Sequence, residues 1–158
     1  MFSLIACIGK NRELGAGGKL CFRLKEDMRF FKETTLGHKI LMGRKTWETL
    51  PAGGLPGREN IVVSRNEVPG ANWVVNDLKW FLEENAKLKE EIFVIGGGMV
   101  YFEALPYAQN LYLTEVDEGY EGADAWFPEF DKSAYDREVI KKGVENGVAY
   151  TIVKYTKK

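Results

Sequence analysis

A chain of 158 residues is long enough for one domain, and folding at this size buries about 70% of the unfolded chain's surface, so no disulfide or metal is needed for a stable core. The formal net charge of −1 and the absence of a strongly basic segment argue against nucleic acid and anionic membranes as partners. The apolar run Phe2–Ile8 is too short to span a bilayer, and no secretion signal accompanies Cys7 and Cys21, so we expect a cytoplasmic protein with reduced thiols.

Strands and helices alternate through most of the sequence. Hydrophobic periodicity predicts strands at 2–8, 39–43, 60–65, 73–75, 91–96 and 110–116, and a terminal pair near 137–142 and 148–155 that is joined across Asn146-Gly147. Helices are predicted near 25–35, 44–50, 77–88 and 98–105. This order is typical of an α/β fold with a largely parallel sheet covered on both faces and an antiparallel C-terminal hairpin. Ligands of such sheets bind at the carboxyl ends of the strands.

A long stretch, Gly9–Phe22, separates the first predicted strand from the first predicted helix. It contains Gly15, Gly17 and Gly18, a composition that suits a mobile loop beside a ligand pocket. A plain surface connection is the alternative.

The predicted helix at 25–35 presents one acid to the interior. Successive residues of a helix are about 100° apart, so Asp27 lies at the edge of the apolar stripe that contains Met28 and Phe31, whereas Glu26 points toward solvent. A carboxylate among phenylalanine side chains is partly desolvated, which raises its pKa and allows it to bind or deliver a proton. The alternative is that Asp27 only complements the positive end of the helix.

Two apolar runs end on glycine and continue directly into a helix. They are Ile40–Gly43 before Arg44–Leu50, and Ile92–Gly98 before Met99–Leu105. A turn without side chains lets a phosphate approach closely, and the N-terminus of the following helix favours its negative charge. Two such turns on neighbouring strands suit a dinucleotide with a pyrophosphate and an extra phosphate, so we expect NADPH as the ligand.

Other chemistries have little support in the sequence. His38 is the only histidine and we expect it to be a solvated loop residue, and no Cys, His or acidic spacing suits a metal site. Ser3, Ser64 and Ser133 lack a nucleophile elbow and a base, which argues against covalent hydrolysis.

Six motifs follow one another along the chain: Ser3-Leu4-Ile5-Ala6, Asn11-Arg12-x-Leu14-Gly15, Asp27 with Phe31, Met42–Trp47, Leu55–Arg58 and Ile95–Tyr101. In this order they resemble the bacterial dihydrofolate reductase family, from Met1 to about Pro128 and more weakly through the closing hairpin. The resemblance implies a single domain over residues 1–158 with the three-layer dihydrofolate-reductase-like fold, an eight-stranded, mostly parallel sheet and about four helices. It also implies a monomer that reduces 7,8-dihydrofolate to 5,6,7,8-tetrahydrofolate with NADPH and so supplies one-carbon metabolism.

The resemblance assigns a catalytic and a substrate-binding set. In the family, the carboxylate that matches Asp27 hydrogen-bonds the pterin's 2-amino group and N3. It also favours protonation at N5, where water delivers the proton. The threonine that matches Thr114 is connected to this carboxylate. Phe22 matches a further catalytic position. Arg58 follows a Pro-Gly turn, from which its guanidinium would meet the glutamate-tail carboxylate of the substrate. The other expected substrate contacts are Ile5, Met28, Phe31, Leu50, Leu55 and Ile95.

The cofactor contacts follow from the same resemblance. Arg44, Ser64 and Arg65 match positions around the 2′-phosphate, Lys45 and Thr46 match pyrophosphate contacts, and Gly96, Gly97 and Gly98 form the facing turn with a cis peptide at Gly96-Gly97. Cys7, Leu14 and Gly15 match the backbone around the nicotinamide carboxamide. The remaining expected contacts are Leu20, Gly43, Met99, Val100 and Tyr101.

The chain departs from the family before the first helix, where Leu20-Cys21-Phe22 replaces the usual Leu-Pro-Trp. Loss of proline frees the loop backbone, and loss of tryptophan removes an indole N–H that would anchor a water near the pterin. The segment around Gly122–Asp124 keeps an acid that could bond this loop. Two alternatives remain: the pyrimidine reductase of riboflavin synthesis, against which Asp27 and Arg58 argue, and a non-catalytic NADPH-binding module.

Overall fold

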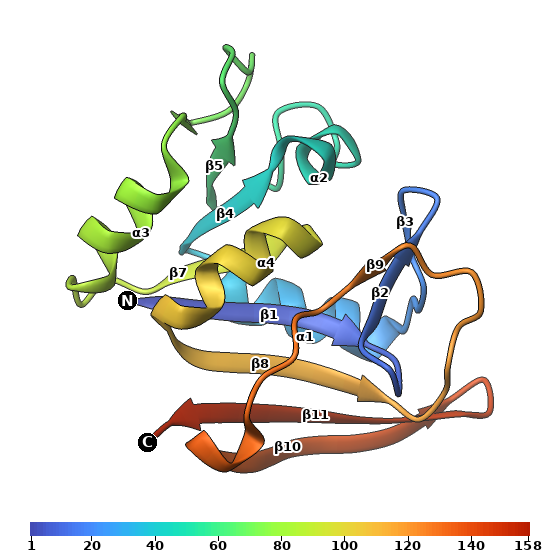
Figure 1. Cartoon of the computed structure of the whole chain (residues 1–158). Coiled ribbons are helices and arrows are strands. Elements are labelled where there is room, and N and C mark those ends of the chain that lie inside the picture. Colours follow the sequence, from blue (N-terminus) through green and yellow to red (C-terminus); the bar gives the residue numbers. More distant parts are fainter.

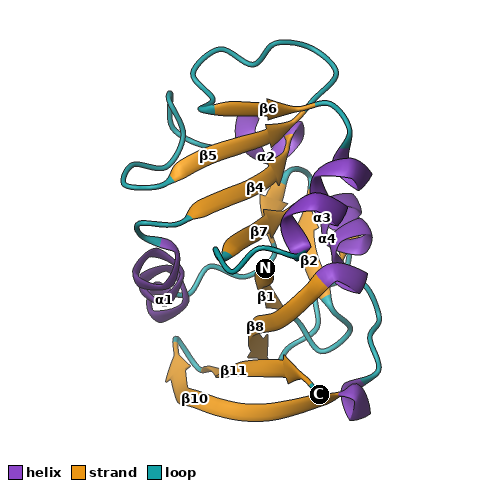
Figure 2. Ribbon diagram, turned by 90° about the vertical axis from the view of Figure 1, so that its left-hand side faces the viewer, coloured by secondary structure: helices purple, strands orange, loops and turns teal.

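The centre of the molecule is an eight-stranded sheet in the order β10-β11-β8-β1-β7-β4-β5-β6, seen in a computed structural model that describes every residue from Met1 to Lys158 (Figures 1 and 2). The strands are β1 (Phe2–Ile8), β4 (Lys39–Gly43), β5 (Glu59–Val63), β6 (Trp73–Val75), β7 (Ile92–Gly96), β8 (Ala108–Val116), β10 (Tyr135–Glu145) and β11 (Val148–Lys157). The six strands from β8 to β6 are paired in parallel, and β11 pairs antiparallel with both β8 and β10. The predicted mostly parallel sheet with an antiparallel hairpin is therefore confirmed.

Helices cover both faces of this sheet. They are α1 (Lys25–Thr35), α2 (Arg44–Glu48), α3 (Leu78–Ala86) and α4 (Gly98–Ala104), with short 3-10 turns η1 (Leu105–Tyr107) and η2 (Lys132–Ala134). Figure 2 shows α1 on one face and α3 and α4 on the opposite face. None of the helices combines the length and the hydropathy that crossing a membrane requires.

The core lies between the sheet and its helices. Twenty buried residues form its larger cluster, including Leu4 on β1, Val94 on β7 and Leu113 on β8. The central strands are buried on both faces and read as continuous apolar runs, which is typical of parallel sheets. The C-terminal hairpin turns at Asn146 and Gly147, whose φ angles of 51° and 77° fit the two-residue turn that an Asn-Gly pair favours.

The segment before α1 contains two strands that periodicity did not predict. β2 (Glu13–Ala16) pairs with β3 (Lys19–Leu20) and with β9 (Ala125–Trp126) in a separate three-stranded sheet. These strands have two to four residues, too few for an alternation to be read. Because β9 comes from a distant part of the chain, no local pattern could indicate the pairing.

Candidate active site

Asp27 lies on α1 with its carboxylate turned toward the sheet. The Thr114 hydroxyl, on β8, donates a hydrogen bond of 2.5 Å to Asp27 Oδ1, and the Cys7 thiol on β1 lies close enough to this carboxyl to influence its pKa. Burial raises the pKa of Asp27 above its ordinary value, and the Thr114 hydrogen bond and then the Cys7 thiol oppose the rise. Burial, and then the nearby charge of Asp27, raises the pKa of the Cys7 thiol, so the thiol stays protonated and remains a donor.

The neighbouring acid, Glu26, faces the other way. Lys141 on β10 donates a hydrogen bond of 2.6 Å to Glu26 Oε2, and Arg29 lies 3.4 Å from Oε1. The hydrogen bond from Lys141 lowers the pKa of Glu26. The prediction that only one of these two adjacent acids is aimed at the interior is confirmed.

An apolar wall lies near the acid. Five of the expected substrate contacts belong to one hydrophobic cluster: Ile5, Phe31, Leu50, Leu55 and Ile95. Of these, only Ile5 is fully buried. Partly buried apolar side chains on α1, after α2 and on β7 suit a slot for a flat ring system. Met28 is also an expected contact, but its side chain is 52% exposed and lies outside this cluster.

Arg58 is held in place beside the C-terminal end of α1. Its Nε and Nη2 donate to the Pro56 carbonyl at 3.0 and 2.8 Å, and its Nη1 donates to Thr35 Oγ1 at 3.2 Å. Burial lowers the pKa of Arg58, yet a guanidinium remains charged in proteins. Since three of its five N–H groups are used, two remain for a carboxylate.

The two glycine turns meet at the carboxyl ends of β4 and β7. A β-carbon on Gly43 would lie 3.8 Å from Gly97 N, and one on Gly96 would lie 3.4 Å from Thr46 Oγ1. Gly43 and Gly97 are the N-cap residues of α2 and α4, and neither helix has a side-chain cap, so their first N–H groups are free for an anion. The predicted cis peptide at Gly96-Gly97 is present. This donor set fits a pyrophosphate.

The expected 2′-phosphate residues also come together. Arg44, at the start of α2, donates from Nη1 to Ser64 Oγ at 3.4 Å, just after β5. Arg65 follows Ser64 and is exposed. The contact brings Arg44 next to Ser64, the residue before Arg65, so both arginines remain candidates for neutralising a dianion here.

Two expected cofactor contacts on α4, Val100 and Tyr101, have buried side chains that belong to the core. Val100 and Tyr101 are 6% and 4% exposed, and the Tyr101 hydroxyl donates a hydrogen bond of 2.6 Å to the Ile5 carbonyl. These two side chains support the glycine turn from within the core. Met99 is 73% exposed, so its side chain stays accessible to a ligand.

The segment with Leu14, Gly15, Leu20 and Phe22 is tied to the loop before β9. Asp124 Oδ2 accepts a hydrogen bond of 3.0 Å from Gly17 N, and Asp124 N donates to the Gly15 carbonyl at 2.9 Å. The acid expected near Gly122–Asp124 therefore bonds this segment. Sequence reasoning missed Tyr120, whose ring meets that of Phe22 edge to face with centroids 6.1 Å apart.

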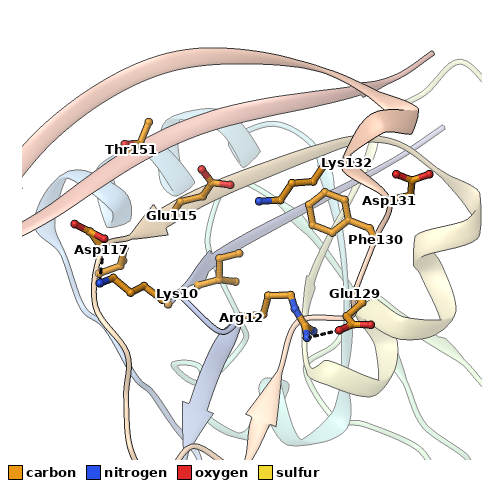
Figure 3. Close-up of a pocket in the computed structure, with 12 residues that line it drawn as sticks. Lys10, Arg12, Glu115, Asp117, Glu129, Phe130, Asp131, Lys132 and Thr151 are labelled. Carbon is orange, nitrogen blue, oxygen red and sulfur yellow. Dashed lines mark hydrogen bonds and ion pairs between the residues drawn. The ribbon is translucent and has the colours of Figure 1, made fainter.

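A separate cavity lies away from these residues. It has a volume of about 780 Å³ and is lined by residues at the ends of β1 and β8, on β11 and around η2, most of them polar or charged (Figure 3). It contains neither Asp27 nor the residues of the glycine turns. No group of three or more His, Cys, Asp and Glu side chains is placed to hold a metal ion.

A carboxylic acid held away from water supplies protons but no reducing equivalents. The two glycine turns have the form that a nicotinamide dinucleotide requires, since their free N–H groups suit a pyrophosphate and the Arg44 side chain suits a further phosphate. The fold and the site together define an α/β reductase that uses such a dinucleotide.

Comparison with known proteins specifies the family. A family model described as dihydrofolate reductase matches residues 1–157. The chain is 42% identical to dihydrofolate reductase from Neisseria gonorrhoeae over 161 residues (97% of this chain, 96% of the relative), and 39% identical to that from Bacillus subtilis strain 168 over 164 residues (100% and 95%). Dihydrofolate reductase from Enterococcus faecalis, solved with NADP(H) and RAB-propyl, superposes with a TM-score of 0.85 at 29% identity, covering 100% of this chain and 96% of that one.

The chain belongs to the dihydrofolate reductase family. It is an NADPH-dependent oxidoreductase that converts dihydrofolate to tetrahydrofolate, a carrier in one-carbon metabolism. These matches set aside the pyrimidine reductase of riboflavin synthesis.

Proposed function

We propose that Asp27 is the acid of this reaction and that Thr114 and Cys7 control its proton. When bound, NADPH supplies the hydride, which is accepted by C6 of the pterin. The adjacent N5 must gain a proton, because negative charge left there would oppose the transfer. A carboxyl whose pKa is raised by burial holds a proton more readily than an exposed carboxyl does, and its ionised form can accept hydrogen bonds from the pterin's 2-amino group and N3.

The proton travels from solvent to N5 through water, with Asp27 favouring its arrival. Phe22 stands beside this path and carries no N–H, so it shapes the pocket by packing alone. The edge-to-face contact with Tyr120 fixes the ring of Phe22. Water must therefore be oriented by Asp27 and Thr114 in this chain.

The substrate lies in the apolar slot with its tail at Arg58. Phe31, Leu50 and Leu55, together with Ile5 and Ile95, contact the pterin and aminobenzoyl rings. Met28 has an exposed side chain that can cover the rings from α1. The two free N–H groups of Arg58 pair with the carboxylate of the glutamate tail.

The cofactor lies across the two glycine turns. Lys45, Thr46 and the N–H groups of α4 hold the pyrophosphate, and Arg44, Ser64 and Arg65 hold the 2′-phosphate. At the opposite end, the backbone of Cys7, Leu14 and Gly15 meets the nicotinamide. Val100 and Tyr101 act from within the core by supporting the turn.

We further propose that residues 1–158 form one domain that acts as a cytoplasmic monomer without a nucleic-acid partner. One continuous sheet connects both ends of the chain, which supports a single domain. The net charge of −1 supports the absence of a polyanionic partner.

The contact between Thr114 and Asp27 carries the proposal, because it places the acid under the control of a donor at the edge of the slot. Following NADPH absorbance with purified protein tests it. Oxidation of NADPH that requires dihydrofolate supports the proposal. Binding of NADPH without turnover would show a non-catalytic module and overturn it.

A further inference from the structure

Glu13 is the only charged residue among the buried side chains, with 3% of its surface exposed. It forms no ion pair. Instead, its Oε1 accepts a hydrogen bond of 2.8 Å from Asn11 N, and its Oε2 accepts one of 2.7 Å from Tyr120 N. Burial acts to raise the pKa of Glu13, but the backbone hydrogen bonds from Tyr120, Glu13 and Asn11 outweigh it and hold the pKa below its ordinary value. The carboxylate is therefore ionised at neutral pH.

The space around this carboxylate is made by two glycines. A β-carbon on Gly9 would lie 2.5 Å from Glu13 Oε1, and one on Gly119 would lie 3.4 Å from Oε2. Any larger residue at Gly9 would displace the carboxylate. The chain thus provides both the donors and the room for an ionised group.

Glu13 joins two segments that border the active site. On one side, it begins β2, which continues into Leu14 and Gly15 at the expected nicotinamide end of the cofactor site. On the other side, it binds Tyr120, whose ring packs against Phe22. One carboxylate therefore influences the position of both segments.

The outer surface of the same junction carries two ion pairs, visible in Figure 3. Lys10 lies 3.4 Å from Asp117, and Arg12 lies 3.1 Å from Glu129. Three of these four side chains are more than half exposed, and exposed pairs contribute little because water screens them. Among the acidic side chains at this junction, only that of Glu13 is buried, and a backbone hydrogen bond of 2.9 Å from Lys10 N to the Glu118 carbonyl joins the same two segments.

We propose that Glu13 is a positioning residue for the cofactor, holding Leu14 and Gly15 on one side and Tyr120 with Phe22 on the other in the arrangement that receives nicotinamide. This assignment rests on the proposed function of Leu14 and Gly15. Through Tyr120, Glu13 would hold Phe22 in place without the proline and tryptophan that the family has at positions 21 and 22.

The test compares Glu13→Gln, which keeps the shape but offers one acceptor in place of two, with Glu13→Val, which removes both. Glu118→Gln, an exposed acid in the loop joined to β2, is the matched control for the loss of charge. Three quantities are measured: amide hydrogen exchange at Asn11, Gly17 and Tyr120 without ligands, and the separate dissociation constants of NADPH and dihydrofolate.

In Glu13→Gln, exchange protection at Tyr120 or Asn11 should fall by about tenfold or more, and the dissociation constant of NADPH should rise by about tenfold. The dissociation constant of dihydrofolate and the exchange of amides in β1 and β8 should stay within about twofold. Glu13→Val should show the larger effect, and Glu118→Gln should match the wild type.

Three results would overturn the assignment: unchanged protection in Glu13→Gln, equal weakening of both ligands, or global unfolding of Glu13→Gln, which would make the residue a general stabiliser. Exchange without ligands does not depend on catalysis. Absence of dihydrofolate reduction in the wild type would therefore count against the proposed function, while the local exchange result would still decide whether Glu13 joins the two segments.

Discussion

The hydroxyl of Thr114 and the carboxylate of Asp27 form a 2.5 Å hydrogen bond that connects the last parallel strand of the sheet to the first helix. The bond stabilises the ionised form of Asp27, whereas burial favours the protonated form. The proposed mechanism uses both: an ionised group that orients the pterin and a proton held close to N5. We expect the balance between these two effects to set the pH range of the enzyme.

Replacing Thr114 by valine keeps the shape of the side chain and removes its donor. The pKa of Asp27 should rise further, because burial remains while one opposing hydrogen bond is lost. The high-pH limb of the kcat/KM profile should move to higher pH, and the free energy of unfolding at neutral pH should fall by about 1–2 kcal/mol. Thr114→Ser, which retains the donor, should return the limb toward its original position. A limb that stays fixed in the valine variant would contradict the role of Thr114.

Asp27→Asn should stabilise the ligand-free protein at neutral pH. Since the pKa of Asp27 is raised in the folded state, the folded protein binds its proton more tightly than the unfolded chain does, and stability is lost as pH rises through the folded pKa. Removing the ionisable group removes this loss. Denaturant unfolding should show a higher free energy of unfolding for Asp27→Asn than for the wild type at neutral pH, and this difference should disappear below the ordinary carboxyl pKa. Glu26→Gln is the contrasting variant and should not stabilise, because Lys141 lowers the pKa of Glu26.

Arg44→Ala should change cofactor preference. Arg44 lies against Ser64 at the expected 2′-phosphate site, so its removal should raise KM for NADPH by about tenfold. KM for NADH, which lacks that phosphate, should change little and serves as the internal control. Equal increases for both cofactors would show that Arg44 acts on the shape of the site instead.

Arg58→Ala should raise KM for dihydrofolate by about tenfold or more while leaving NADPH binding unchanged, since a charged, two-point contact with the tail carboxylate would be lost. Arg58→Lys keeps the positive charge but loses the two-point guanidinium contact, so its KM for dihydrofolate should lie between those of the wild type and Arg58→Ala. The measurement is repeated with a reduced pterin that lacks the glutamate tail. If Arg58→Ala impairs that substrate equally, the residue does not bind the tail.

Local patterns in the sequence were sufficient to predict the elements of the large sheet, the orientation of Asp27 relative to Glu26, and the two glycine turns. Each of these depends on spacing within a few residues. The pairing of β2 with β9 and the Glu13 contact with Tyr120 could not be predicted, because they join segments more than 100 residues apart, whereas the pairing of β2 with β3 is local but its strands are too short to show periodicity. A charged residue directly before Leu14 gave no sign that it would be buried.

The single histidine shows a similar limit. We expected His38 to be a solvated loop residue, but its ring packs edge to face on Phe93 with centroids 5.1 Å apart and lies 3.9 Å from the Glu91 carboxylate. Both partners belong to the region of β7, which is distant in sequence from His38. His38 does lie in the loop between α1 and β4, with 39% of its side chain exposed, as expected; only its contacts with Phe93 and Glu91 could not be predicted from the sequence.

The most direct test of the account is the rate of NADPH oxidation with dihydrofolate at neutral pH, measured for the wild type and for Asp27→Asn together with NADPH binding. We predict that the variant binds NADPH as the wild type does and that its rate falls by about 10²-fold or more. Undiminished turnover in Asp27→Asn would contradict the assignment of Asp27 as the acid.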